Sequence, residues 1–248
     1  MSETADPVPA QPDPERARGI RSYVLRRSHF STAQRDAYER LMPIYGIPFT
    51  AQPLDFTHVF GRAAPRVLEI GFGMGETTAE IAAAYPHIDY LGVEVHTPGV
   101  GALLKRIESQ GLRNIRVIEF DAQAVVRHQI PDGSLTGIHV FFPDPWPKAR
   151  HHKRRLLQPQ FVTNLVAKLL AGGYLHFATD WPEYAEQMNE VLEATAGLSS
   201  VRPAGGAINA AYGADGAPTR PETKFERRGV ALGHPIADLI RYRVDGPR

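Results

Sequence analysis

The chain contains no cysteine, which excludes disulfide bonds, cysteine-ligated zinc and thiol nucleophiles. It also lacks a strong charge of either sign: the formal net charge is +1 over 248 residues, so the overall balance indicates no partner. No apolar run approaches the length of a membrane span, and the first 19 residues lack the apolar stretch typical of a signal peptide. We therefore expect a protein of a reducing cytoplasm that does not associate with a membrane.

Composition divides the chain into three parts. Residues 1–20 are rich in Pro, Asp and Glu and predict a disordered tail, and residues 21–64 form an N-terminal extension. Residues 65–248 suit one α/β domain, since a hydrophobic content of 43% is enough for a sizeable core. Within this domain a stretch rich in Gly, Ala and Pro, near 197–221, predicts a flexible insertion.

The segment 67–75, VLEIGFGMG, carries the clearest motif. An apolar strand bearing the acidic Glu69 leads into a glycine turn, after which a helix is expected. Glycines at such a turn let the backbone bend tightly and let a ligand approach the main chain. A nicotinamide fingerprint would place its third glycine where this chain has Glu76. The observed spacing instead favours S-adenosylmethionine (SAM) over a nicotinamide cofactor, and a tight turn without a ligand stays an alternative for this segment alone. The three glycines are Gly71, Gly73 and Gly75.

From Arg66 onward, strand-length apolar segments alternate with helix-length segments, as in a parallel sheet with crossover helices. The predicted parallel strands are Val67–Ile70, Tyr90–Val95, Ile115–Phe120, Gly137–Phe142 and Tyr174–Thr179. The predicted helices lie near Glu76–Ala84, Gly99–Gln110, Ala122–His128, Gln160–Leu170 and Trp181–Ala194. Two closing strands are expected at Phe225–Leu232 and Asp238–Val244. This layout predicts the Rossmann-like α/β fold of class I methyltransferases, with seven mostly parallel strands and an antiparallel terminal pair.

Acidic residues stand at the ends of the predicted strands, where ligands of open α/β sheets collect. Glu69 can face the amino group or sulfonium of SAM, and Glu94 can accept hydrogen bonds from both ribose hydroxyls. Asp121 can accept from the adenine amino group, while the backbone N–H of Ala122 donates to the ring. A single acid would more often cap the following helix, but the succession beside the glycine turn favours a cofactor site. The series continues with Asp144 and Asp180.

The segment 143–155, PDPWPKARHHKRR, combines a proline-stiffened loop with a dense basic run. Such a run is often a solvated loop, but beside the predicted site it favours RNA or DNA as a partner. Its basic members are Lys148, Arg150, His151, His152, Lys153, Arg154 and Arg155. Trp146 and Trp181 could equally stack on a base or anchor packing. The remaining histidines show no metal-ligand spacing, so no metal is expected.

Together these segments resemble the bacterial tRNA (guanine-N7-)-methyltransferase family. The resemblance covers nearly everything from Arg21 to Arg243. Two of its motifs, FPDPWPK with the basic run and T-x-F-E-x-R-G, are absent from generic methyltransferases. The matching pieces are RSYVLR (21–26), LEIGFGMGE (68–76), GVEVH (92–96), FFPDPWPKARHHKRRL (141–156), ATDWPEYAEQM (178–188) and TKFERRG (223–229).

The resemblance implies methyl transfer from SAM to N7 of guanine in tRNA, at guanine 46 of the variable loop. It implies SAM binding by Glu69, Glu94, Asp121 and Asp144, with Asp144 as the catalytic aspartate. The residues implied to contact the substrate are Lys148, Asp180, Thr223, Lys224, Phe225 and Glu226, and those implied to contact RNA are Arg150 to Arg155. The alternative is another SAM-dependent methyltransferase acting on RNA or a small molecule. Whether the chain acts as a monomer or a dimer stays open.

Overall fold

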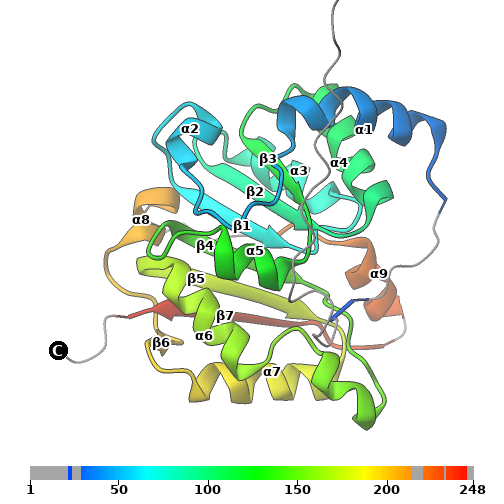
Figure 1. Ribbon diagram of the computed structural model, residues 1–248. Helices are drawn as coiled ribbons and strands as arrows, with labels where there is room; N and C mark the ends of the chain where they lie inside the picture. Colours follow the sequence, from blue (N-terminus) through cyan, green and yellow to red (C-terminus); the bar gives the residue numbers. More distant parts are fainter. Residues whose placement is uncertain (1–21, 24–28, 214–219, 232, 245–248) are drawn as a thin grey trace, which may run out of the picture.

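The structure is a computed structural model that describes residues 22–23, 29–213, 220–231 and 233–244. The tail predicted for residues 1–20 lies outside these ranges. A seven-stranded sheet forms the centre, with helices on both faces (Figure 1). The strands are β1 (Arg66–Ile70), β2 (Asp89–Glu94), β3 (Ile115–Glu119), β4 (Leu135–Phe141), β5 (Leu169–Thr179), β6 (Leu198–Ser199) and β7 (Ala237–Arg243). The helices are α1 (Thr32–Tyr45), α2 (Phe56–Phe60), α3 (Glu76–Ala84), α4 (Thr97–Gln110), α5 (Ala122–His128), the 3-10 helix η1 (Ala149–Arg154), α6 (Pro159–Lys168), α7 (Pro182–Ala194), α8 (Ala207–Tyr212) and α9 (Lys224–Ala231).

The strand order is β3-β2-β1-β4-β5-β7-β6. Neighbours among β1 to β5 pair in parallel, whereas β7 runs antiparallel to both β5 and β6. The predicted fold class, mostly parallel with an antiparallel terminal pair, is therefore confirmed. The five predicted parallel strands and the five helices between and after them all overlap the observed elements.

One predicted strand is wrong. Phe225–Leu232 was expected to pair with the last strand, but this segment forms α9. The reason is a capping box: the Thr223 hydroxyl accepts from the Glu226 amide at 3.0 Å, and the Glu226 carboxylate accepts from the Thr223 amide at 3.4 Å. The other terminal strand is β6, which lies in the stretch predicted as an insertion. That stretch also contains α8, two of whose side chains are buried.

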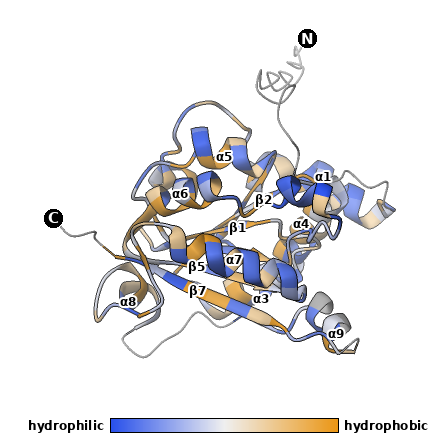
Figure 2. Ribbon diagram, turned by 90° about the horizontal axis from the view of Figure 1, so that it is seen from below, coloured by the Kyte–Doolittle hydropathy of each residue, from blue (hydrophilic) through white to orange (hydrophobic). Residues whose placement is uncertain are grey.

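Two large clusters form most of the apolar core, one on each face of the sheet, and a small third cluster joins α8 to β5 and β7. The first cluster joins the sheet to α5, α6 and α7, and the second joins it to α1, α3 and α4. Strands covered on both faces are mainly apolar, and β2, buried at every position, is charged only at its two ends, Asp89 and Glu94. Figure 2 shows mainly hydrophobic strands, with hydrophilic residues on the outer side of α7. Within the described ranges, no helix combines the length and apolarity needed to cross a bilayer.

Candidate active site

The strand order reverses between β1 and β4, and such a switch point is where open α/β sheets bind their ligands. Glu69 of β1 lies opposite His139 of β4, so the two strands end at the same level. The glycine turn that follows β1 and the loop that follows β4 therefore lie at the same end of the sheet. The sequence-predicted donor site and the Asp144 loop are brought together by this pairing.

The glycine turn leaves open space against the main chain. Gly71 and Gly73 have φ of 75° and 57°, and a Cβ atom added at either would meet nothing within 4 Å. At two other glycines the space is filled: an added Cβ at Gly75 would lie 2.6 Å from Leu103, and one at Gly99 would lie 2.1 Å from the Gly73 carbonyl oxygen. Packing against α4 thus fixes one side of the turn, and the side at Gly71 and Gly73 stays open to a ligand.

Glu69 is a buried acid whose charge has no partner in the described residues. It is 3% exposed, and its Oε2 atom accepts no hydrogen bond. Burial raises the pKa of Glu69 to about 7; the nearby Thr78 hydroxyl opposes this rise and the charge of Glu94 adds to it. An unpartnered carboxylate beside open main chain suits a cationic ligand, so these residues fit SAM.

Glu94 ties the glycine turn to the end of β2. One carboxylate oxygen accepts from the Gly73 amide at 2.9 Å, and the other accepts from the amides of Val95 (2.7 Å) and His96 (3.1 Å). Burial raises the pKa of Glu94, and these three backbone bonds oppose the rise. The structure therefore gives Glu94 a role in holding the turn. Its predicted bonds to the ribose remain a prediction.

Asp121 lies at the start of α5, where its side chain caps the helix by accepting from the Ala124 amide at 3.1 Å. This is the capping role that a single acid after a strand would have. Asp121 and Ala122 are both half-buried. Their contacts to adenine remain predictions, because capping engages one carboxylate oxygen and does not exclude a ligand at the other.

The loop that carries Asp144 is held in an unusual conformation. Phe142 and Trp146, on either side of Asp144, have φ of 51° and 46°, a region that non-glycine residues rarely occupy. Asp144 itself is exposed. The Trp146 indole donates to the Ser22 carbonyl oxygen at 3.1 Å, so this tryptophan anchors packing. Trp181 likewise packs against the core, with its ring edge-on to His234.

Arg155 anchors the Asp144 loop from its buried side. Its side chain is 1% exposed, and its Nε atom donates to the Pro145 carbonyl oxygen at 2.8 Å. The guanidinium also donates to Gln187 at 2.5 Å and Glu183 at 3.3 Å of α7. The basic run is thus not uniform: Arg155 is buried against the Asp144 loop, whereas Lys148, Arg150 and Lys153 are exposed. His151, His152 and Arg154 are half-buried.

The third part of the site is α9, which packs closely on the end of β5. A Cβ atom added at Gly229 would lie 2.9 Å from the Cβ of Asp180, so only glycine allows this approach. Glu226 is three residues before Gly229 and lies on the same side of the helix. α9, which carries Glu226, is therefore packed against Asp180, and the joint contact of these two acids with the substrate remains a prediction. Lys224 and Phe225 belong to α9, but their side chains lie outside the described residues.

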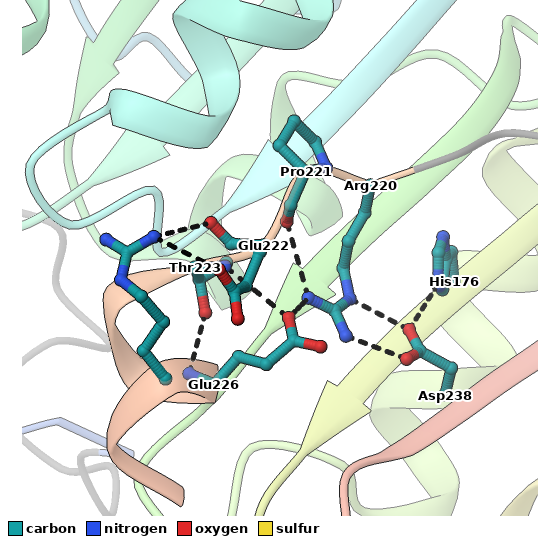
Figure 3. A network of polar contacts seen from close by, with 8 residues as sticks. His176, Arg220, Pro221, Glu222, Thr223, Glu226 and Asp238 are labelled. Carbon is teal, nitrogen blue, oxygen red and sulfur yellow. Dashed lines mark hydrogen bonds and ion pairs between the residues drawn. The ribbon is translucent and has the colours of Figure 1, made fainter. Parts of the chain in front are cut away.

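Sequence reasoning missed Arg220, which joins these parts (Figure 3). Its side chain is 5% exposed and forms ion pairs with Glu226 of α9 and Asp238 of β7. Its guanidinium also lies 5.3 Å from the centre of the Phe142 ring. Arg220 stands at the end of the Gly/Ala/Pro-rich stretch, where no motif signals a function, and its partners are remote in sequence except for Glu226.

The raised pKa of Glu69 predicts a pH-dependent affinity for SAM. A cationic donor binds the ionised carboxylate better, so affinity should rise from pH 6 to pH 7.5 by up to about eightfold. Calorimetry in buffers of different ionisation enthalpy should detect the released proton. Glu69→Gln is the matched control and should bind more weakly, without this dependence. A wild-type affinity that is as flat as that of the variant would contradict the prediction.

The raised pKa of Glu69 also makes the stability of the fold depend on pH, and this stability falls as the pH rises. The folded pKa of about 7 lies above the ordinary 4.5, so protonated Glu69 favours the folded protein without donor. Its stabilising contribution is full below about pH 4.5 and is lost as the pH rises through about 7.

The buried position of Arg155 predicts that Arg155→Ala lowers both stability and turnover. Losing several hydrogen bonds from a buried cation should reduce the free energy of unfolding by about 2–3 kcal/mol. The kcat should fall as well, because Pro145, next to Asp144, loses its anchor. Denaturant unfolding and steady-state kinetics measure the two effects. The neighbouring Lys153→Ala, at an exposed position, should leave stability unchanged. Equal stabilities for the two variants would argue against the anchor.

The fold and this site define a class I SAM-dependent methyltransferase. A family model described as "Putative methyltransferase" matches residues 63–239. A solved aminoglycoside resistance methyltransferase shares the fold, with a TM-score of 0.51 at 13% identity over 78% of this chain and 95% of that one. The tRNA (guanine-N(7)-)-methyltransferase of Nitrosomonas eutropha is 57% identical over 89% of this chain and 95% of its own length. That of Neisseria meningitidis is 52% identical over 93% of each chain. The chain belongs to the tRNA (guanine-N(7)-)-methyltransferase family.

Proposed function

We propose that this protein transfers a methyl group from SAM to N7 of guanine in tRNA, at guanine 46 of the variable loop. The observation that supports this most is the joint position of the open glycine turn and the strained Asp144 loop at the switch point of the sheet. The names of relatives more than 50% identical over nearly the whole chain supply the substrate. Because tRNA is the substrate, we also propose that the protein acts in the cytoplasm.

The donor would lie against the glycine turn. Gly71 and Gly73 offer open main chain, and the carboxylate of Glu69 would face the positive charge of the donor. Gly75 begins α3 and fixes the turn against Leu103. When bound, SAM supplies a methyl group on a positively charged sulfur. The remaining residues proposed to contact it are Glu94, Asp121, Ala122 and Asp144.

Asp144 would act on the guanine. N7 carries an in-plane lone pair, so no proton has to leave before it attacks the methyl carbon, and a strong general base is unnecessary. Alignment of N7 with the methyl carbon and sulfur would supply much of the acceleration. As positive charge moves onto the base, the carboxylate of Asp144 would stabilise it. The exposure of Asp144 on a loop with two strained backbone positions suits this electrostatic role.

Asp180 and Glu226 would select guanine over adenine. Guanine presents two donors on one edge, its N1–H and N2 amino groups, and two neighbouring carboxylates can accept from them. Adenine lacks this pair of donors. The close packing of Gly229 on Asp180 supports this proposal, because Gly229 and Glu226 belong to the same helix, α9. The other residues proposed to contact the substrate are Lys148, Thr223, Lys224 and Phe225.

The RNA would bind along η1 and the helices beside it. A hollow of about 250 Å³ lies between α5, η1 and α6, and its lining includes Arg127, Lys153 and Arg154. These three elements contain no acidic residue, so they present an excess of positive charge, which suits phosphates. A narrow A-form major groove would hide N7, which favours a target in an irregular region of folded tRNA. The residues proposed to contact RNA at the surface are Arg150, His151, His152, Lys153 and Arg154.

The experiment that tests this function uses purified protein, labelled SAM and unmodified tRNA transcripts. We expect label in the tRNA and, after borohydride and aniline treatment, strand cleavage at 7-methylguanosine in the variable loop. A transcript with adenine at the target position is the control and should stay unlabelled. Label without cleavage would indicate a different RNA methyltransferase, and no label with measurable SAM binding would indicate a small-molecule substrate.

A further inference from the structure

We propose that Arg220 is a positioning residue that sets the Glu226 carboxylate for recognition of the guanine edge. The inference rests on the function proposed above, and it concerns a residue outside every motif that the sequence offered. Arg220 acts through Glu226 and does not itself contact the base.

The contacts of Arg220 fix its guanidinium in one orientation. Nε and Nη2 donate to the two oxygens of Asp238 at 2.9 and 2.7 Å, a fork geometry that restricts both partners. Nη1 donates to one oxygen of Glu226 and to the Pro221 carbonyl oxygen at 3.4 Å. In Figure 3 the two acids approach Arg220 from two sides.

Asp238 is itself anchored to the sheet. His176 of β5 lies 2.8 Å from the same carboxylate, and its side chain is buried. Although partial burial opposes it, hydrogen bonds from His176 and Arg220 hold the pKa of Asp238 well below its ordinary value. The carboxylate thus stays charged over the working range of pH. The orientation of Arg220 is therefore fixed relative to β5 and β7, which carry His176 and Asp238.

The charges leave Glu226 able to accept a further hydrogen bond. One arginine faces two carboxylates, so Arg220, Glu226 and Asp238 together keep a net negative charge. Arg220 and the Thr223 amide both engage Oε2 of Glu226, which leaves Oε1 without a hydrogen bond among the described residues. The two hydrogen bonds to Oε2 restrict rotation of the carboxylate and therefore the directions in which Oε1 can point. An acid held in this way can discriminate between bases that differ by one donor.

Arg220 also connects this acid to the Asp144 loop. Its guanidinium lies 5.3 Å from the centre of the Phe142 ring, and Phe142 has the strained φ two residues before Asp144. On the other side, α9 rests on Asp180 through Gly229. Arg220 therefore sits where the proposed methyl-transfer loop and the proposed guanine-reading acids meet.

A purely structural role and a positioning role predict different kinetics. We would compare tRNA transcripts that carry guanine or inosine at the target, because inosine keeps N7 but lacks the N2 amino group. Wild-type protein should prefer guanine in kcat/KM by about ten- to hundredfold, as expected for a lost bond to a charged acceptor. Arg220→Ala should reduce this ratio to within about threefold of one, chiefly by losing activity on guanine. A merely structural change would lower both rates equally and leave the ratio unchanged.

Two further variants keep the test decisive. Arg220→Lys retains the charge without the fork and should give an intermediate ratio, even if Arg220→Ala folds poorly. Glu226→Gln should reduce the ratio by itself, and adding Arg220→Ala should cause no further loss, because both act on one interaction. Calorimetry with SAM checks that the donor site is intact, and its affinity should not change.

Each contrary result is distinguishable. A wild-type guanine preference in Arg220→Ala, or an additive loss in the double variant, would overturn the positioning role. Methylation of guanine at N7 without any preference over inosine would also overturn it, while leaving the proposed function in place. Absence of methylation in wild-type protein would instead remove the proposed function itself.

Discussion

Replacing Asp144 with Asn should lower kcat by about a hundred- to a thousandfold, the usual effect of removing a preorganised electrostatic contact. Asparagine keeps the size of the side chain and removes its charge. If Asp144 stabilises the positive charge that develops on the purine, the loss must appear in turnover at saturating tRNA and SAM. The structure supports this role, because Asp144 is exposed beyond the carboxyl end of β4, on a loop with strained residues on either side.

A matched control separates this effect from a general loss of surface charge. Asp132 carries an exposed carboxylate, 74% accessible, that pairs with Lys168 at 2.6 Å. It precedes β4, whereas Asp144 follows it, so the two acids lie at opposite ends of this strand. Asp132→Asn should leave kcat unchanged. SAM affinity, measured by calorimetry, shows whether Asp144→Asn also weakens the donor site. A kcat for Asp144→Asn within about threefold of wild type would remove the electrostatic role.

The parts of the site that are local in sequence could be predicted. The glycine turn needs only consecutive residues, and its spacing indicated both its conformation and its ligand. The alternation of strands and helices placed Asp144 and Glu69 at the ends of strands. Because parallel strands run in one direction, their carboxyl ends lie at the same end of the sheet. Both inferences depend on backbone geometry, which neighbouring residues largely determine.

The parts that depend on tertiary contacts could not be predicted. Arg155 looked like its basic neighbours, but contacts with α7, remote in sequence, bury it. The segment after Thr223 was predicted as a strand from its place near the end of the chain. The capping pair Thr223 and Glu226 could have signalled a helix, since a Thr followed three residues later by Glu is a known helix start. Arg220 had no local signal, because Asp238 is remote in sequence.

The glycine turn gives the second prediction with a large effect. Gly71→Ala should weaken SAM binding by about ten- to hundredfold, because the added methyl group enters the open space proposed for the donor. The backbone cost is separate: an L-residue at φ of 75° should lose about 1–2 kcal/mol of stability. Calorimetry measures the first effect and denaturant unfolding measures the second.

Gly61 provides the control that distinguishes these two effects. It has φ of 71°, and an added Cβ would again meet nothing within 4 Å, yet it ends α2, outside the glycine turn. Gly61→Ala should therefore lose about the same stability, 1–2 kcal/mol, and bind SAM normally. If both variants bound SAM equally well, the space in front of Gly71 would not be the donor site. If both bound it equally poorly, strain alone would explain the loss. Only a difference in donor affinity at matched stability assigns the space to the ligand.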